Sequence, residues 1–365
     1  MNTHTAPRPL GWLLASLSLG MLLPSLGTSI ANVALPTFTQ AFGAPFQQVQ
    51  WVVLAYLLAT TTLVVGAGRL GDLVGRRRLF LGGLVLFTVA SLLCAVAPTL
   101  GWLVAARALQ GAGAAVLMAL TMAFVGASVP KDRNGRAMGL LGTMSAVGTA
   151  LGPSLGGVLI AGFGWRSIFV LNLPLGLVAL WLAWRNLPAD GPRRAATRFD
   201  GLGTLLLAVT LAAYALAMTL GRGRMLPWLV AVVVGAVLFV AVERRSASPL
   251  VRLASLREPV LSAGLAMSAL VSAVVMASLV VGPFYLAAAF GLGAALVGAT
   301  LSAGPVVSAL VGVPAGRLVD GWGAVRVTRV GLLAMLSACL ALGWVPAAWG
   351  VAGYVLPLVL LTTGY

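Results

Sequence analysis

The first candidates for chemistry are polar side chains that lie within long apolar stretches of the chain. Arg107 lies inside one such stretch, and Gln110 follows three residues later. A charged side chain is costly in hydrocarbon, so we expect Arg107 to face a protein interior or a wet cavity. It has either a functional role or a structural one, in which it bonds backbone carbonyls and Gln110. Asn32 and Tyr56 are further polar groups that either line a cavity or bond a neighbouring helix.

Acidic residues are few, and their positions limit the chemistry that the chain can support. All seven fall in polar connections or at the ends of apolar stretches. Proton-coupled export usually uses a carboxylate embedded in the apolar region, because its pKa shifts with desolvation. Three alternatives stay open: the carboxylate lies beyond this chain's last residue, a loop acid works together with Arg107, or the protein is not driven by protons.

Catalytic and cofactor chemistry lacks the side chains that it would need. The only histidine is His4, in a short polar head, and both cysteines, Cys94 and Cys339, lie within apolar stretches. The sequence contains no paired nucleophile and base, no cluster of metal ligands and no phosphate-binding loop. We therefore expect no enzyme, no metal, no cofactor and no use of ATP.

A glycine-rich motif occurs twice, in two connections that lie far apart in the chain. The first copy reads GRLGDLVGRRR and the second GRLVDGWGAVR. Glycines allow tight turns, an aspartate can cap the next helix, and arginines can pair with that aspartate. A basic cluster that only sets topology is the alternative. We interpret the two copies as equivalent cytoplasmic loop motifs, in which Gly68, Arg69, Leu70, Asp72 and Gly75 match Gly316, Arg317, Leu318, Asp320 and Gly323, and Arg76 follows the first set.

Small residues recur one helical turn apart in the stretch GTALGPSLGG. Small residues let two helix backbones approach closely. A proline removes one helical hydrogen bond and favours a bend. We interpret the stretch as a surface for tight helix packing and as a hinge between two half-bundles, formed by Gly148, Gly152, Pro153, Gly156 and Gly157.

The elements that position these residues are membrane-spanning helices. The chain has 365 residues, of which 60% are hydrophobic and only 8% charged. Apolar stretches of roughly 18 to 25 residues recur along it, each long enough to cross a hydrocarbon core as a helix. A membrane β-barrel would need short alternating segments, which do not occur. Twelve apolar segments are predicted, at 10–34, 50–68, 79–97, 101–125, 137–162, 165–184, 201–220, 226–242, 260–284, 294–315, 328–345 and 348–365.

The basic residues predict the orientation of these segments. If the N-terminus is cytoplasmic, all but four of the 23 Lys and Arg fall in cytoplasmic connections or at cytoplasmic segment ends. This bias predicts a multi-pass protein of a cytoplasmic-type (plasma) membrane. The net charge of +16 therefore does not require nucleic acid. Trp51, Trp102 and Trp165 lie near segment ends, where we expect them to anchor the protein at the membrane interface.

The offset between the two loop motifs predicts the domain organisation. If the connection after the second segment matches the one after the tenth, the ninth segment restarts the pattern begun by the first. We therefore expect a six-helix bundle at 1–186, a linker with two inserted helices at 187–258 and an incomplete four-helix bundle at 259–365. The chain would then be a C-terminally truncated form of a fourteen-span protein.

Several motifs together resemble the major facilitator superfamily, in particular its fourteen-helix drug:proton antiporter family. Besides the two loop motifs, the resemblance rests on LGTSIANVALP at 26–36, RALQGAGAA at 107–115, GTALGPSLGG at 148–157 and WRSIFVLNLPLG at 165–176. It covers the first six segments closely and is looser beyond Asp200. One departure is Gly27, which stands where the family signature has an aspartate.

The resemblance implies a monomeric secondary transporter that exports small amphiphilic compounds or drugs by proton antiport and alternating access. It also implies that Arg107 is linked to proton coupling, and that Gly148 to Gly157 form the motif associated with antiporters. Two alternatives stay open: a facilitator or importer that shares the fold, or a truncated membrane protein that does not transport.

Overall fold

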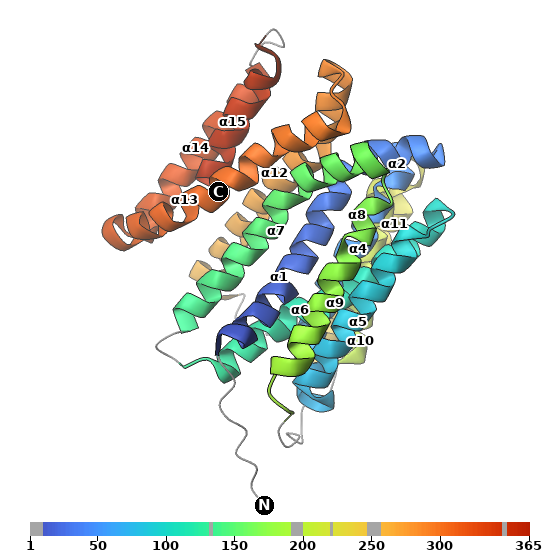
Figure 1. Cartoon of the computed structure of the whole chain (residues 1–365), viewed down its shortest axis with the longest axis vertical. Helices are drawn as coiled ribbons and strands as arrows, with labels where there is room; N and C mark the ends of the chain where they lie inside the picture. The colour runs from blue at the N-terminus through green and yellow to red at the C-terminus, as the bar shows by residue number, and fades with distance from the viewer. Residues whose placement is uncertain (1–9, 131–133, 191–199, 220–221, 247–256, 345–348) are drawn as a thin grey trace, which may run out of the picture. The chain divides into compact units, whose positions relative to one another are not determined.

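A computed structural model of the chain describes residues 10–130, 134–190, 200–219, 222–246, 257–344 and 349–365. The regular elements in these ranges are all α-helices (Figure 1). Their bounds are α1 Leu10–Val33, α2 Leu35–Phe42, α3 Phe46–Val49, α4 Trp51–Val74, α5 Arg76–Ala95, α6 Leu100–Ser128, α7 Asn134–Phe163, α8 Ser167–Val170, α9 Asn172–Asn186, α10 Gly201–Thr219, α11 Arg222–Arg245, α12 Pro259–Phe290, α13 Ala294–Trp322, α14 Ala324–Trp344 and α15 Gly350–Gly364.

The helices confirm the predicted all-α, polytopic fold class. Ten stretches of helix among the described residues are long and apolar enough to cross a membrane. Two shorter apolar helices, Ala294–Ser308 and Gly350–Gly364, account for the remaining predicted segments. Each of the twelve predicted segments therefore lies on helix.

Contacts between Cα atoms divide the chain into two compact units. Unit 1 consists of Met1–Pro24, Phe42–Gly142 and Phe169–Ser262, and unit 2 of Ser25–Ala41, Thr143–Ile168 and Ala263–Tyr365. Helices α1 and α7 each contribute to both units. The three-part organisation expected from the loop motifs stays a prediction.

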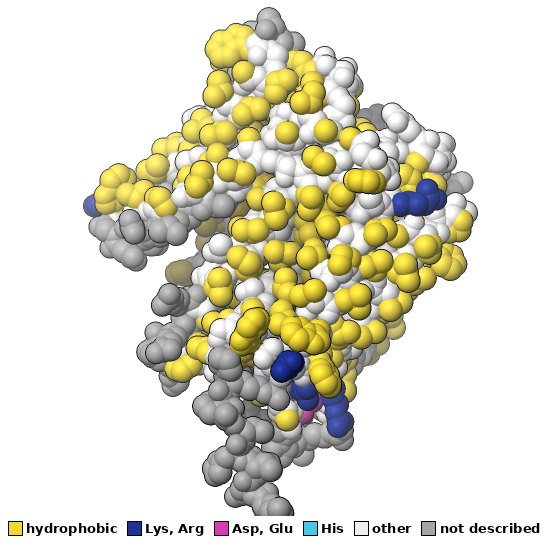
Figure 2. Space-filling model, in the orientation of Figure 1, with side chains coloured by type: hydrophobic (Ala, Val, Ile, Leu, Met, Phe, Trp, Pro, Cys, Tyr) yellow, Lys and Arg dark blue, Asp and Glu magenta, His cyan; other side chains and the backbone are white. Residues whose placement is uncertain are grey.

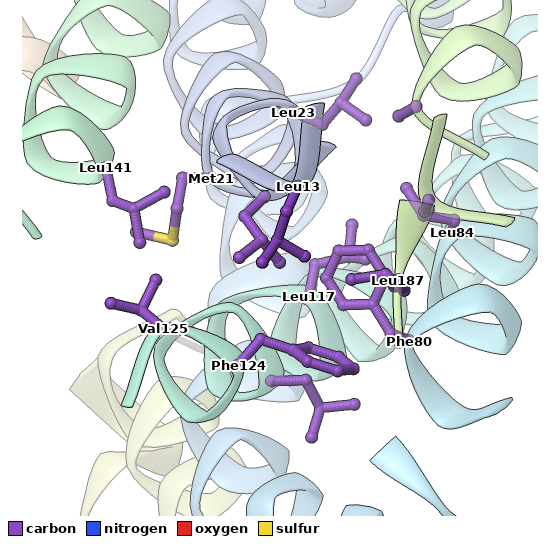
Figure 3. Close-up of a cluster of buried hydrophobic side chains, with 14 of the residues drawn as sticks. Leu13, Met21, Leu23, Phe80, Leu84, Leu117, Phe124, Val125, Leu141 and Leu187 are labelled. Atoms are coloured by element: carbon purple, nitrogen blue, oxygen red, sulfur yellow. The ribbon is translucent and has the colours of Figure 1, made fainter. Parts of the chain in front are cut away.

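Unit 1 has an apolar core in which the first half of α1 packs with α5, α6 and α9. Figure 3 shows side chains from these helices converging, among them Leu13 of α1, Phe80 of α5 and Leu117 of α6. Phe80 and Phe124 meet edge to face, with ring centroids 5.9 Å apart. Glycines bring these helices close, because a Cβ on Gly83 would lie 2.6 Å from the Val116 side chain. The core thus fixes α6 against its neighbours.

Unit 2 has a smaller core formed by the end of α1 with α12, α13 and α15. Its buried members are Val33, Leu286, Val297, Leu301, Tyr354 and Leu358. The expected interfacial role of Trp165 is wrong, because its side chain is buried and meets the Phe38 ring edge to face at 5.4 Å. A buried indole ring contributes more to the stability of the fold than an exposed one, because a larger apolar area is removed from the surroundings.

The two copies of the loop motif end in the same backbone feature. Gly75 separates α4 from α5 with φ +112°, and Gly323 separates α13 from α14 with φ +82°. Positive φ is accessible to glycine at little cost, which explains a glycine at both positions. The earlier motif residues extend α4 and α13 beyond their apolar segments. The surroundings of Gly316 and the side chain of Asp320 lie outside the described part of the chain.

Candidate functional site

Arg107 lies on α6 within unit 1 and is completely buried, as is Gln110 one turn later. The buried face of α6 is otherwise made of small and apolar residues. A buried guanidinium needs partners for its N–H groups, since an unpaired polar group in an apolar region is costly. The arrangement of those partners defines the candidate site.

Three helices supply the polar partners of Arg107. Its Nε donates to the Val52 carbonyl of α4 at 2.9 Å, and its Nη1 donates to the Gln110 Oε1 at 2.5 Å. The Gln110 Nε2 donates in turn to the Ser91 hydroxyl of α5 at 2.7 Å, and Ser91 donates to the Phe87 carbonyl. The result is a chain of hydrogen bonds across α4, α6 and α5. The bonds to a backbone carbonyl and to Gln110 that the structural alternative expects are therefore present, and the functional role of Arg107 stays a prediction.

Aromatic rings complete the surroundings of the guanidinium. The Arg107 Cζ lies 4.2 Å from the centroid of the Tyr56 ring and 6.0 Å from that of Phe169. A cation over an aromatic face is stabilised by the ring quadrupole, most strongly where water is excluded. The Tyr56 hydroxyl donates to the Pro24 carbonyl at 2.9 Å, which holds the ring in place. Tyr56 therefore belongs to the same site as Arg107 and Gln110.

Gly111 is the reason that α4 and α6 can approach closely beside this site. A Cβ at that position would collide with the Tyr56 carbonyl oxygen. The Thr60 hydroxyl reinforces the contact by donating to the Gly111 carbonyl at 3.1 Å. Thr60 therefore bonds α4 to α6.

The charge of Arg107 has only neutral partners among the described residues. No carboxylate there lies within ion-pair distance, and the buried Nη2 has no hydrogen-bond partner. An arginine remains protonated in proteins. The site is thus a fixed cation whose Nη2 group is unused and can bind an acceptor that enters the protein.

Asn32 lies on the part of α1 that belongs to unit 2. It is buried, and neither its amide nitrogen nor its amide oxygen has a hydrogen-bond partner among the described residues. Buried amides without partners are uncommon, so Asn32 is a second candidate for contact with a ligand. It stays a separate prediction from the Arg107 site.

Asp72 and Arg76 form the ion pair of the first loop motif. Arg76 Nη2 lies 2.8 Å from Asp72 Oδ1, and its Nε donates to the same oxygen at 2.9 Å. Arg76 Nη1 also donates to the Ala123 carbonyl of α6 at 3.3 Å, so the pair joins α4 to α6. Gly68 and Arg69 lie on the last turns of α4.

The prediction that Asp72 caps the following helix is wrong. The N-terminus of α5 is capped by Asp190, whose Oδ1 accepts from the Arg77 N–H at 2.7 Å and whose Oδ2 accepts from the Arg78 N–H at 3.3 Å. The reason is that α4 continues to Val74, which leaves Asp72 inside the preceding helix. Asp190 offsets the helix dipole at an N-terminus that otherwise begins with three arginines.

The glycines of α7 form tight backbone contacts inside unit 2. A Cβ on Gly152 would collide with Ser29 of α1, and one on Gly156 would lie 2.7 Å from Ile30. A Cβ on Gly157 would lie 2.5 Å from the Ala294 carbonyl oxygen of α13. The tight packing predicted for these residues is therefore present. The hinge, including the roles of Gly148 and Pro153, stays a prediction.

Sequence reasoning missed a pair of buried acids where the start of α10 meets the end of α11. Asp200 caps α10 by accepting from the Gly203 N–H at 2.8 Å, and its other oxygen accepts from the Ser246 hydroxyl at 2.9 Å. A Cβ on Gly203 would lie 2.7 Å from Glu243 Oε1, so both carboxyl groups adjoin this glycine. A signal was the Asp–Gly pair directly before an apolar stretch, which is typical of a helix start.

A bundle of apolar spanning helices with a buried cation and glycine-mediated helix contacts defines a polytopic membrane protein. A family model of the Major Facilitator Superfamily matches residues 17–365. The chain therefore belongs to the Major Facilitator Superfamily and is a membrane-embedded protein of that class.

Similar proteins include transporters with different named roles. The Multidrug resistance protein Stp of Mycobacterium tuberculosis is 37% identical over 254 residues, which cover 67% of this chain and 47% of Stp. The riboflavin transporter RibZ of Clostridioides difficile is 37% identical over 190 residues, which cover 52% of this chain and 42% of RibZ. The chain spans about half the length of these curated relatives.

The solved structures confirm the fold. The partially occluded, inward-open xylose transporter XylE from E. coli superposes with a TM-score of 0.67 at 16% identity. The superposition covers 97% of this chain and 81% of XylE. At this identity the likeness concerns the fold alone.

Proposed function

We propose that the protein is a secondary active transporter that exports small amphiphilic compounds or drugs by proton antiport. In this proposal the N-terminus is cytoplasmic, the membrane is the cytoplasmic one, and two helical bundles alternate in access to a central site. The Asp72–Arg76 pair holds the cytoplasmic ends of α4 and α6 together. The similarity to Stp, a protein named for multidrug resistance, supports the substrate class.

The buried Arg107 is the observation that carries the proposal. A cation that is completely buried and contacts only neutral groups carries a large desolvation cost. A neutral side chain in a purely structural role would avoid that cost. Its unused Nη2 can bind the carbonyl or anionic group of a substrate, or a carboxylate during proton exchange. Either event would couple binding to the position of α6 against α4.

Efflux from proteoliposomes tests the proposal. The 365-residue chain is reconstituted, an amphiphilic dye is enclosed, and a proton gradient is imposed. We expect dye release that depends on the gradient and is lost in Arg107→Gln. The control Arg166→Gln changes an exposed arginine elsewhere and leaves release unchanged. Dye release equal to that of protein-free vesicles under every gradient would refute the proposal.

A facilitator or importer is the second candidate, and the similarity to RibZ favours it. RibZ is named as a riboflavin transporter, and its sequence identity to this chain, 37%, equals that of Stp. Accumulation of radiolabelled solute inside the same vesicles, without a proton gradient and with no dye release, would support this candidate.

A further inference from the structure

An apolar groove runs between α5 and α9 on the outer surface of unit 1. Its volume is about 400 Å³, and it is lined by Leu81, Leu177, Leu180, Trp181 and Trp184. Leu177 is 60% exposed and Trp184 63% exposed, so the groove is open to the surroundings of the protein. In a membrane-embedded helix pair these surroundings are lipid. The groove is therefore shaped to hold an apolar chain.

Arginines surround one end of this groove. Arg77 lies one helical turn before Leu81, and its Nη2 donates to the Trp184 carbonyl at 2.5 Å. Arg185 lies one turn after Trp181, and its Cζ lies 5.7 Å from a ring centroid of that tryptophan. The Arg77 bond to α9 and the ring contact of Arg185 within α9 thus place two guanidinium groups at the point where α5 begins and α9 ends.

The balance of charge at this end is positive. Arg78 is exposed beside Arg77, and the described carboxylate nearest to them in the hydrogen-bond network is Asp190, which accepts from their backbone N–H groups. Figure 2 shows dark blue side chains gathered at the lower end of this face, where α5 and α9 meet in Figure 1, with yellow side chains extending above them. Apolar groove and basic end are therefore continuous.

We propose that this groove binds an anionic phospholipid, with an acyl chain along Leu177 and Trp181 and the phosphate on Arg78 and Arg185. The charge selects an anionic headgroup over a zwitterionic one, because basic groups next to spanning helices attract anionic lipids. The groove selects a lipid over a soluble anion, because an acyl chain that covers the apolar side chains of the groove removes their surface from contact with water or headgroups, which is favourable. The two exposed tryptophans suit the level of the headgroups, where indole rings concentrate.

Native mass spectrometry of the purified chain tests the proposal. The protein in detergent is titrated with phosphatidylglycerol and, separately, with phosphatidylcholine of the same acyl chains. We expect phosphatidylglycerol to bind more tightly. Each arginine removed should lower this preference about fivefold, as expected for one basic group at a membrane surface. The variants are Arg78→Gln, Arg185→Gln and the two combined.

A matched control is available in Arg166→Gln. Arg166 is also exposed and also lies over a tryptophan, with its Cζ 4.3 Å from the Trp165 ring, but it does not adjoin the groove. The control should keep the full preference. If the double variant does not fold, Arg78→Gln alone decides the question, since its side chain is exposed. Equal binding of the two lipids by the parent chain, an equal loss in the control, or displacement of the lipid by equimolar inorganic phosphate would overturn the proposal.

Discussion

The Asp190 cap of α5 makes a prediction that can be tested without knowing any substrate. The carboxylate receives two backbone N–H bonds, of 2.7 and 3.3 Å, from residues 113 and 112 positions earlier. Replacing Asp190 by alanine removes both bonds and the negative charge of the carboxylate that receives them. We expect Asp190→Ala to destabilise the chain by about 1 kcal/mol, the usual loss for a helix cap.

The conservative variant separates hydrogen bonding from charge. Asparagine keeps an oxygen that can accept the N–H bonds but carries no charge. We expect Asp190→Asn to cost about 0.5 kcal/mol through the helix dipole and the adjacent arginines, and this part to shrink at high salt. The measurement is equilibrium unfolding in mixed micelles with increasing SDS, followed by tryptophan fluorescence.

The control is Asp72→Ala. Asp72 is the aspartate that the loop motif alone would predict to cap α5. Its pair with Arg76 is about one third exposed on both sides, so removing it should cost less, about 0.3–0.5 kcal/mol. The reasoning is refuted if Asp72→Ala costs more than Asp190→Ala, or if Asp190→Ala leaves the unfolding curve unchanged.

Two further predictions concern the Arg107 site. Gly111→Ala should lower stability by about 1–3 kcal/mol in the same unfolding assay, because the new Cβ collides with the Tyr56 carbonyl. The control Gly126→Ala, on the same helix, meets nothing within 4 Å and should be neutral or slightly stabilising. Equal effects of the two variants would contradict the close contact. Arg107→Lys should abolish dye release and also destabilise the fold, because a single ammonium group cannot reproduce the two guanidinium bonds, to the Val52 carbonyl of α4 and to Gln110. Dye release at the parent rate would show that these two bonds are dispensable.

The fold could be predicted from the sequence because hydrocarbon imposes a simple length rule. Every predicted segment lies on helix, but the helix ends were less predictable. Segment 50–68 becomes α4, which ends at Val74, and segment 260–284 becomes α12, which ends at Phe290. A helix stops where its backbone turns, at a residue such as Gly75, and not where its apolar residues stop. The short helices α2 and α3 were missed because they contain no long apolar run.

The candidate site could be predicted only where its partners are close in sequence. The spacing of Arg107 and Gln110 places both on one face of a helix, and the bond between them was foreseen. Ser91 and the Val52 carbonyl come from other helices, so no local pattern indicates them. The Asp190 cap is hidden for the same reason, since nothing in the motif at Gly68 to Arg78 refers to a residue beyond α9.

The contact between α7 and α13 has a consequence for which residues unit 2 can accept there. At Gly157 and Gly298 the main chains touch directly, since an added Cβ at Gly298 would strike the Pro153 carbonyl. The separation of the two helices is therefore set by backbone atoms alone. Any larger residue at either glycine would force the helices apart, because no side chain lies between them that could rearrange to make room.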